Sequence, residues 1–311
     1  MQITVVQNDS GYRQHEATQL PRILGTAFPS AQIQVLQTNS EGGAFELAAN
    51  SLARSDYVVT VGDDRTLHEL INATLGSVQA HSGNELPVFS LLPLGTHSDF
   101  NHALGVEGDI HELCEMISQD SSRPVDVGRV RYNNDNGDTE ECFFINAMDV
   151  GIGASVLKHM VTGGRYLGGN LHYLESILAS LFENRDIELH VETDTGVSWR
   201  ERTLAVVATN SGYHSDGIRL TTDPFIDEGQ LLITLVKDIR AVDLLRNLHG
   251  LRIADQPRQP GFIYEKAGWL RITATRGAAP VQADGRFLGS TPVEVDVLQE
   301  RVRFLCPPRS A

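Results

Sequence analysis

Residues 57–66 have the sequence YVVTVGDDRT, in which a run of β-branched and aromatic residues stops at Gly62. A helical pattern of apolar residues follows from Leu67 to Leu75. A glycine at the end of a strand lets the backbone turn sharply and approach a bound group closely. The stretch therefore predicts a strand, a glycine turn and a helix, which is the repeating unit of a parallel sheet covered by helices.

The same pattern occurs on both sides of this stretch. The apolar run Ile3–Gln7 ends in the turn residues NDSG at positions 8–11, and Val88–Leu92 ends in PLG at 93–95. Ile33–Leu36 is a further candidate strand. Ligands of parallel sheets bind at the carboxyl ends of the strands. We therefore expect these turns to lie at a ligand-binding edge.

The pattern changes near Arg123 and Pro124, because most later segments have strand character, among them Leu204–Thr209 and Leu231–Val236. We predict two domains. The first is an α/β domain with a parallel sheet over residues 1–125. The second is a mainly antiparallel β-sandwich over 126–311, with the alternative that the C-terminal tail returns to the first domain.

Composition excludes several classes of protein. The net charge of −15 argues against a nucleic-acid partner, since phosphate binding needs a basic face. No apolar run approaches the roughly 20 residues of a membrane span, and the first residues do not resemble a signal peptide. The three cysteines lie far apart, which favours neither zinc nor a disulfide framework. We expect a cytoplasmic protein without a transmembrane segment.

Residues 93–100 have the sequence PLGTHSDF and resemble the P-L-G-T-x-N-D-F segment of diacylglycerol kinases and sphingosine kinases. Residues 62–66 stand where that family has G-G-D-G-T, and residues 8–11 resemble its opening N-P-x-S-G turn. Residues 144–146 (FIN) and 284–286 (DGR) resemble its F-I-N and D-G-E motifs. The chain is thus similar to bacterial members of this lipid kinase superfamily, from residue 8 to Pro292.

The resemblance implies a nucleotide-binding first domain of the type found in NAD kinases and diacylglycerol kinases, a second domain that supplies the acceptor pocket, and ATP with Mg²⁺ between them. The expected activity is ATP-dependent transfer of the γ-phosphate to a lipid hydroxyl, with a diacylglycerol-like acceptor met transiently at the inner membrane face. The residues expected to contact the nucleotide are Asn8, Ser10, Gly11, Gly62, Asp64, Arg65, Thr66, Gly95 and Thr96.

The resemblance also implies roles for acidic residues. Asp284 would be the general base that takes the proton of the lipid hydroxyl, and Asp64 is the second candidate catalytic residue. Asp227 and Glu228 match two acids that precede a glycine in the family and would hold a metal, although a solvated turn explains this pair equally well. An acidic turn such as residues 62–66 is, taken alone, also typical of a helix cap.

Several positions depart from the family pattern. Asp63 and Arg65 replace glycines, Arg286 replaces a glutamate and Ser98 replaces an asparagine. Two unit charges about 4 Å apart interact by roughly 4 kcal/mol at an effective dielectric constant of 20, so an acid that faced ATP phosphates would oppose binding. Arg65 would neutralise Asp63 or grip a phosphate, or both side chains would point into solvent. The Ser215–Asp216 pair replaces two further glycines.

These departures leave two rival hypotheses. One is a catalytically impaired or inactive homologue that binds lipid or nucleotide. The other is an NAD kinase, which shares the glycine-rich loop and a comparable two-domain plan. The segment at 93–100 favours the lipid kinases.

Overall fold

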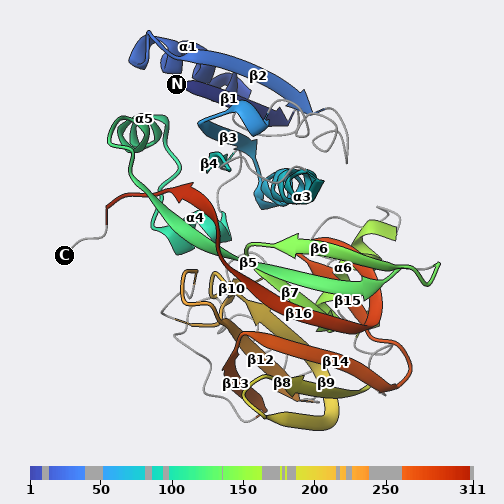
Figure 1. Cartoon of the computed structure of the whole chain (residues 1–311). Coiled ribbons are helices and arrows are strands. Elements are labelled where there is room, and N and C mark those ends of the chain that lie inside the picture. Colours follow the sequence, from blue (N-terminus) through green and yellow to red (C-terminus); the bar gives the residue numbers. More distant parts are fainter. Residues whose placement is uncertain are drawn as a thin grey trace. The chain divides into compact units, whose positions relative to one another are not determined.

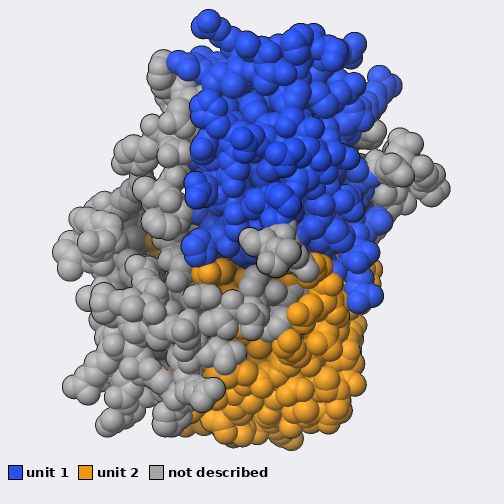
Figure 2. All heavy atoms as spheres, turned by 90° about the vertical axis from the view of Figure 1, so that its left-hand side faces the viewer, with its two compact units in different colours: residues 1–127, 299–311 blue, residues 128–298 orange. Residues whose placement is uncertain are grey.

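The computed structural model describes residues 1–8, 14–38, 52–80, 86–93, 98–134, 136–162, 176, 179–180, 187–214, 218–221, 226–237 and 261–308. The chain divides into two compact units (Figures 1 and 2). Unit 1 comprises Met1–Val127 and Gln299–Ala311, and unit 2 comprises Gly128–Leu298. The C-terminal segment therefore belongs to the same unit as the N-terminal residues.

Unit 1 contains a parallel sheet with the strand order β2-β1-β3-β4. The strands are β1 Gln2–Asn8, β2 Gln32–Thr38, β3 Tyr57–Gly62 and β4 Val88–Pro93. The end of β16 (Arg286–Leu305) extends the sheet, because Arg303 and Phe304 pair in parallel with Val88 and Phe89 of β4. Parallel pairing of this kind agrees with the strand–turn–helix pattern of the sequence.

Helices flank the sheet of unit 1. Their bounds are α1 Gln14–Ala27, α3 Asp64–Ala80, α4 Asp99–Leu104 and α5 Ile110–Ser118, with the 3₁₀ helix η1 at Leu52–Arg54. Helix α1 packs on β2 and α5, while α3 packs on β3 and β4. Among the described helices of the chain, none is long and apolar enough to cross a membrane.

Three aromatic rings from distant parts of the sequence meet in the core of unit 1. The ring of Phe304 lies 5.7 Å from that of Phe89 and 4.6 Å from that of Phe100, measured between centroids. All three side chains are fully buried. Burial of a phenylalanine stabilises a fold by about 1.5–3 kcal/mol, so the C-terminal segment is an integral part of this core.

Unit 2 is built mainly from antiparallel strands. Their bounds are β5 Ser122–Asn133, β6 Thr139–Phe144, β7 Ala147–Gly151, β8 Glu188–Thr193, β9 Ser198–Thr209, β10 Tyr213–His214, β11 Ile218–Arg219, β12 Leu231–Lys237, β13 Phe262–Ala267, β14 Trp269–Arg276, β15 Pro280–Ala283 and β16, of which β5 and β16 also extend into unit 1. Helix α6 spans Ile152–Thr162.

The antiparallel character expected of this domain is present, and its strand pairing also closes on itself, which the sequence did not predict. Strands β7, β9, β8, β14, β16 and β15 pair in that order, each pair antiparallel, and β15 pairs again with β7. This ring is a barrel. The closure depends on long strands: β16 has 20 residues and pairs with β15 near its start and with β14 further along. Sandwiches and barrels show the same alternation of inward and outward residues, so the sequence pattern does not separate them.

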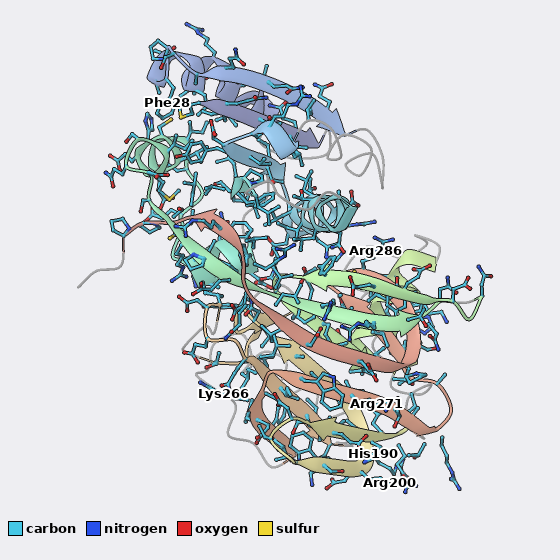
Figure 3. All side chains as sticks on the ribbon, in the orientation of Figure 1. Phe28, His190, Arg200, Lys266, Arg271 and Arg286 are labelled. Atoms are coloured by element: carbon cyan, nitrogen blue, oxygen red, sulfur yellow. The ribbon has the colours of Figure 1, made fainter. Side chains whose placement is uncertain are left out.

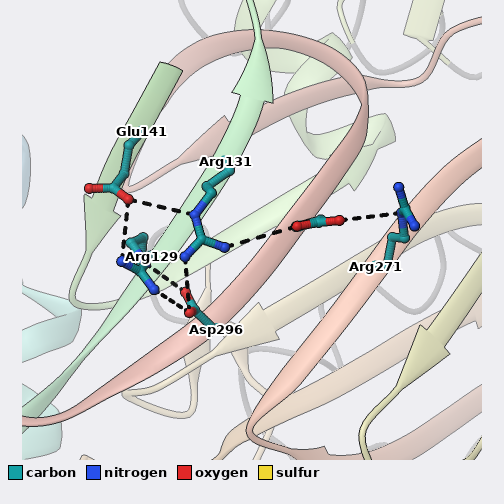
Figure 4. Close-up of polar contacts among 6 residues, drawn as sticks. Arg129, Arg131, Glu141, Arg271 and Asp296 are labelled. Carbon is teal, nitrogen blue, oxygen red and sulfur yellow. Dashed lines mark hydrogen bonds and ion pairs between the residues drawn. The ribbon is translucent and has the colours of Figure 1, made fainter. Parts of the chain in front are cut away.

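An ion-pair cluster joins β5 to β6 and β16 on unit 2 (Figure 4). The Arg129 guanidinium donates two hydrogen bonds to Asp296, of 2.8 and 2.5 Å, and lies 3.4 Å from Glu141. Arg131 contacts the same two acids at 3.3 and 3.7 Å. Burial alone would raise the pKa of Asp296, but the hydrogen bonds and charge of Arg129 outweigh burial and lower it. The cluster therefore holds Asp296 as a carboxylate.

Candidate functional site

The expected ligand-binding turns of unit 1 begin at one edge of the parallel sheet. Gly62 at the end of β3 is paired with Pro93 at the end of β4, and Gln7 of β1 is paired with Val61. The carboxyl ends of β1, β3 and β4 therefore lie side by side. Four residues expected at the nucleotide, Ser10, Gly11, Gly95 and Thr96, lie outside the described residues, as do Ser215 and Asp216.

Gly62 lies close to the first turn of helix α3. A Cβ atom added to Gly62 would lie 2.8 Å from the Thr66 Oγ1 atom and 3.0 Å from the Thr66 Cβ atom. The distance to Oγ1 is shorter than real Cβ contacts, so any other residue at this position would force the Thr66 side chain to shift. The absence of a side chain at Gly62 therefore allows the end of β3 to lie close to the first turn of α3.

Asp63 caps helix α3. Its carbonyl oxygen accepts a hydrogen bond of 3.1 Å from the Leu67 backbone N–H. Its carboxylate oxygen Oδ1 accepts from the Thr66 backbone N–H and the Thr66 hydroxyl, both at 2.8 Å. This is the geometry of a helix N-cap. The exposed Asp63 carboxylate thus occupies donors at a helix terminus that would otherwise suit an anion such as a phosphate.

Asp64 joins the loop after β3 to the segment after β4. Its Oδ1 atom accepts a 2.5 Å hydrogen bond from the Ser98 hydroxyl, and its Oδ2 atom accepts one of 3.1 Å from the Asp99 backbone N–H. Ser98 is the N-cap of helix α4 and accepts from the Asn101 N–H at 3.1 Å. The structure therefore brings two sequence motifs together through Asp64. The serine that replaces the family's asparagine supplies the donor.

Asp284 lies in unit 2, in the hairpin between β15 and β16. Ala283 pairs with Arg286, so the loop consists of Asp284 and Gly285 alone. Both residues have positive φ angles, of 46° and 79°. Two-residue hairpins favour this conformation, and Asp-Gly is among the sequences that adopt it most readily. The motif at 284–286 is therefore a tight hairpin turn.

The Asp284 carboxylate is held by the backbone of residues 145–147. Its Oδ2 atom accepts from the Ile145 N–H at 2.8 Å, and its Oδ1 atom accepts from the N–H groups of Asn146 and Ala147, both at 3.0 Å. The Asp284 N–H in turn donates to the Ala147 carbonyl at 2.9 Å. The DGR and FIN motifs, which are far apart in the sequence, therefore form one structure.

Two further residues, neither of them among the predicted site residues, hold this turn. The Asn210 backbone N–H donates to the Asn146 carbonyl at 2.8 Å, and its side-chain amide donates to the Ile145 carbonyl at 3.3 Å. The Thr209 hydroxyl donates to the Asn146 carbonyl at 3.0 Å. Both side chains are fully buried. The resemblance to the family, which extends from residue 8 to Pro292 and so includes Asn210, was the signal that could have identified this residue.

Asp227 and Glu228 lie in a turn before β12. The Glu228 carboxylate forms an exposed ion pair of 3.2 Å with Lys266, which Figure 3 labels. In the part of the chain that the structure describes, no group of three or more His, Cys, Asp or Glu side chains is arranged to hold a metal ion. The described residues thus do not form a metal cage, and the metal role of Asp227 and Glu228 stays a prediction.

Arg286, the residue that replaces the family's glutamate, is exposed at the start of β16 (Figure 3). Its charge acts on Glu140 of β6. Hydrogen bonds from Asn134 and Tyr132 are the main causes that lower the pKa of Glu140, and Arg286 contributes a smaller effect in the same direction. The substitution therefore places a cation next to an acid on the same unit.

Two family models match the chain in order. The diacylglycerol kinase catalytic domain matches residues 2–130, and the YegS C-terminal NAD kinase beta sandwich-like domain matches residues 146–306. The second match alone covers more than half of the 311 residues. The chain belongs to the diacylglycerol kinase-like lipid kinase superfamily. The family and the kinase class expected from the sequence are confirmed.

Individual proteins agree with the family. The chain is 28% identical over 265 residues to a probable lipid kinase YegS-like from Shewanella frigidimarina, a match that covers 85% of this chain and 79% of that protein. It is 25% identical over 283 residues to a diacylglycerol kinase from Bacillus subtilis, with 88% and 86% covered.

Solved structures share the fold. A putative diacylglycerol kinase from Bacillus anthracis has a TM-score of 0.72 at 21% identity, with 99% of this chain and 97% of that chain covered. Yeast NADH kinase complexed with NADH has a TM-score of 0.58 at 12% identity, with 99% and 84% covered. The fold is therefore common to lipid kinases and to kinases of nicotinamide nucleotides.

Proposed function

We propose that the protein is an ATP-dependent lipid kinase that transfers the γ-phosphate to the hydroxyl group of a diacylglycerol-like lipid at a membrane surface. The observation that carries the proposal is the ordered match of a kinase catalytic domain and its C-terminal partner domain over nearly the whole chain. Relatives matched over most of their length are named lipid kinase or diacylglycerol kinase.

We assign ATP to the edge of the parallel sheet in unit 1. Asn8, Gly62 and Pro93 end three strands there, and the assigned contacts are Asn8, Ser10, Gly11, Gly62, Asp64, Arg65, Thr66, Gly95 and Thr96. Phosphoryl transfer needs mainly positioning and neutralisation of charge. In this assignment Asp64 orients the two loops through Ser98 and Asp99.

Magnesium would accompany ATP, since it usually binds substrate phosphates, several waters and only one or two carboxylates. It would lower the negative charge of the phosphates. Asp227 and Glu228 are the acids assigned to a metal ion by the family resemblance. The ion pair of Glu228 with Lys266 would have to open for that role.

We assign the proton transfer to Asp284. Hydrogen bonds from three backbone N–H groups fix the orientation of its carboxylate, which a general base requires. The carboxylate takes the proton of the lipid hydroxyl, and the resulting alkoxide oxygen forms the new bond to the γ-phosphorus while ADP leaves.

The test is transfer of labelled γ-phosphate from ATP to diacylglycerol in mixed micelles, and to the components of a bacterial lipid extract. We expect a labelled phospholipid that is absent with heat-denatured protein. A folded protein that labels no lipid contradicts the proposal. Phosphorylation of NAD in a coupled assay would instead favour an NAD kinase, whose fold this chain shares.

A second candidate function is binding of lipid or nucleotide without catalysis. The observation that favours it is the Asp63 carboxylate at the start of helix α3, where it takes the donors of Thr66. A thermal-shift titration with ATP separates the candidates. A ligand at 100 times its dissociation constant stabilises the folded state by about 2.7 kcal/mol, so tight ATP binding without any transfer supports this candidate.

A further inference from the structure

A buried pair of polar side chains lies beneath the Asp284 hairpin. Asp149 of β7 and Gln282 of β15 are directly opposite each other in the barrel. Asp149 has no exposed surface and Gln282 is 6% exposed. A buried carboxylate is costly unless it is hydrogen-bonded. The partners of Asp149 therefore decide whether this arrangement is stable.

Asp149 connects the pair to helix α6. Its Oδ1 atom accepts a 2.8 Å hydrogen bond from the Ala154 N–H in the first turn of that helix. A carboxylate is favourable at this position, where the helix dipole is positive. A Cβ atom on Gly153 would lie 2.6 Å from the Asp149 Oδ2 atom, so the glycine makes room for the carboxylate.

Gln282 connects Asp149 to the hairpin. Its Nε2 atom donates to the Asp149 Oδ2 atom, and its Oε1 atom accepts a 2.8 Å hydrogen bond from the Gly285 N–H. The direction of these bonds follows from Asp149. A carboxylate only accepts, so Gln282 must turn its NH₂ group toward Asp149, which leaves its carbonyl oxygen for Gly285.

We propose that Asp149 and Gln282 are positioning residues for Asp284. The chain of hydrogen bonds from helix α6 through Asp149 and Gln282 to Gly285 holds the left-handed hairpin turn. This hairpin turn places the Asp284 carboxylate where it accepts hydrogen bonds from the backbone N–H groups of residues 145–147. The inference rests on the proposed function, in which Asp284 is the base. Loss of either residue therefore slows proton transfer more than it weakens nucleotide binding.

The test uses a double exchange that moves the charge but keeps each of the three hydrogen bonds described above. In Gln282→Glu, two carboxylates face each other. In Asp149→Asn, the new NH₂ group faces another donor, either the Gln282 NH₂ group or the Ala154 N–H. The only escape is a flip of the Gln282 amide, which breaks its hydrogen bond with the Gly285 N–H. In the double variant Asp149→Asn with Gln282→Glu, the new amide at position 149 accepts from Ala154 and donates to the new carboxylate at position 282. The other oxygen of that carboxylate accepts from Gly285. Each change preserves the length of the side chain, so the same atoms remain within reach of one another.

We expect each single variant to lower kcat by about 10- to 100-fold, in keeping with the cost of a misplaced catalytic group, while KM for ATP changes less than about threefold. The double variant should regain kcat to within about fivefold of the original protein. Thr234→Val, which alters another fully buried polar residue of unit 2 on β12, is the control for general disturbance of the barrel.

Hydrogen exchange of the Gly285 amide provides a readout that does not depend on activity. The amide should exchange faster in the single variants and regain protection in the double variant. If the unaltered protein transfers no phosphate to lipid, the proposed function fails while the exchange result still decides whether the pair holds the hairpin.

Two results would overturn the inference. One is a single variant that keeps the original kcat although its Gly285 amide exchanges faster. The other is a folded double variant that remains as slow and as poorly protected as the single variants. If Gln282→Glu does not fold, Gln282→Asn replaces it, because that side chain is one methylene too short to reach both partners.

Discussion

The aspartates of the β3–α3 loop and the aspartate of the β15–β16 hairpin use backbone N–H groups in different ways. Asp63 and Asp64 accept from the first turns of helices α3 and α4, where a phosphate could otherwise bind. Asp284 accepts from three N–H groups of a turn outside any helix. In unit 1 the carboxylates occupy donors that would suit an anionic ligand, whereas in unit 2 the donors fix the orientation of the carboxylate that we propose as the base.

The most severe test of this comparison is Asp284→Asn. An asparagine offers one acceptor oxygen in place of two and cannot take a proton, so we expect lipid phosphorylation to fall by more than about 10³-fold. Loss of hydrogen bonds to a charged group should also lower the free energy of unfolding by roughly 2–4 kcal/mol. Labelled-phosphate transfer and urea denaturation measure the two effects.

Asp194→Asn is the matched control for that change. Asp194 lies in the same unit and its carboxylate accepts a 3.1 Å hydrogen bond from the Gly268 N–H at an exposed turn. This variant should retain lipid phosphorylation. Equal losses of activity in the two variants would show that Asp284 only stabilises the barrel.

The link between the loops of unit 1 is tested by Ser98→Ala. This change removes the hydroxyl that donates a hydrogen bond to Asp64. It also removes the N-cap side chain of helix α4. We expect about a tenfold rise in KM for ATP and a loss of roughly 1 kcal/mol in stability, the usual effect of a lost cap. Steady-state kinetics and thermal unfolding are the measurements.

The N-cap of helix α5 provides the matched control for the loss of the α4 N-cap. Asp109 is its N-cap and accepts from the His111 N–H. Asp109→Ala should cost similar stability without a change in KM for ATP. Ser98→Asn, which introduces the residue common in the family, should preserve nucleotide binding. If Asp109→Ala raises KM as much as Ser98→Ala, the role of Asp64 as a connector is not supported.

The position of the Asp63 carboxylate at the start of helix α3 predicts that the Asp63→Gly variant binds ATP more tightly. Removing a negative charge next to the assigned phosphates should tighten ATP binding by about tenfold, since the electrostatic opposition is lost. Replacement of a cap residue by glycine costs only a few tenths of a kcal/mol. Calorimetric titration with ATP tests this, and unchanged or weaker binding would mean that the Asp63 carboxylate does not oppose the nucleotide.

The stabilisation that Asp296 gains from its arginine partners should depend on pH. The pKa of Asp296 is below its ordinary value of 3.8 in the folded protein, so the unfolded chain binds the proton more readily. The stabilisation is complete above that ordinary value and is lost as the pH falls through the lower folded pKa. Asp296→Asn should lower stability by about 1–2 kcal/mol at neutral pH.

Urea denaturation at a series of pH values down to about 3, below the ordinary pKa of an aspartate, checks this sign. The difference between the original protein and Asp296→Asn should shrink as the solution becomes more acidic. Glu188→Gln, which alters an acid paired with the exposed Arg200, should give a smaller difference. A difference that grows in acid would contradict the direction given for Asp296.

The sequence predicted what depends on local pattern. The apolar runs 3–7, 57–61 and 88–92 predicted strands, and the structure has strands there that each end one residue later, at Asn8, Gly62 and Pro93. A helix cap at the acidic loop was one of the alternatives, and Asp63 forms it. These features depend on residues that are neighbours in the chain.

Features that depend on register could not be predicted in the same way. The hydrogen bonds of Asp284 to residues 145–147 require β7 and β15 to lie side by side. The contact of Gln282 with Asp149 requires that register to be correct to the residue. Closure of the barrel depends likewise on which strands pair, and alternating patterns leave that choice open.

The path of β16 has a consequence for how the protein is made. Phe304 completes an aromatic cluster with Phe89 and Phe100, yet the ribosome delivers it only after every strand of the barrel. Domains of most multidomain chains fold in the order of synthesis. Here the core of the N-terminal unit is complete only once a segment that follows the barrel strands has been synthesised, so we expect this unit to reach its final packing after the barrel sequence is made.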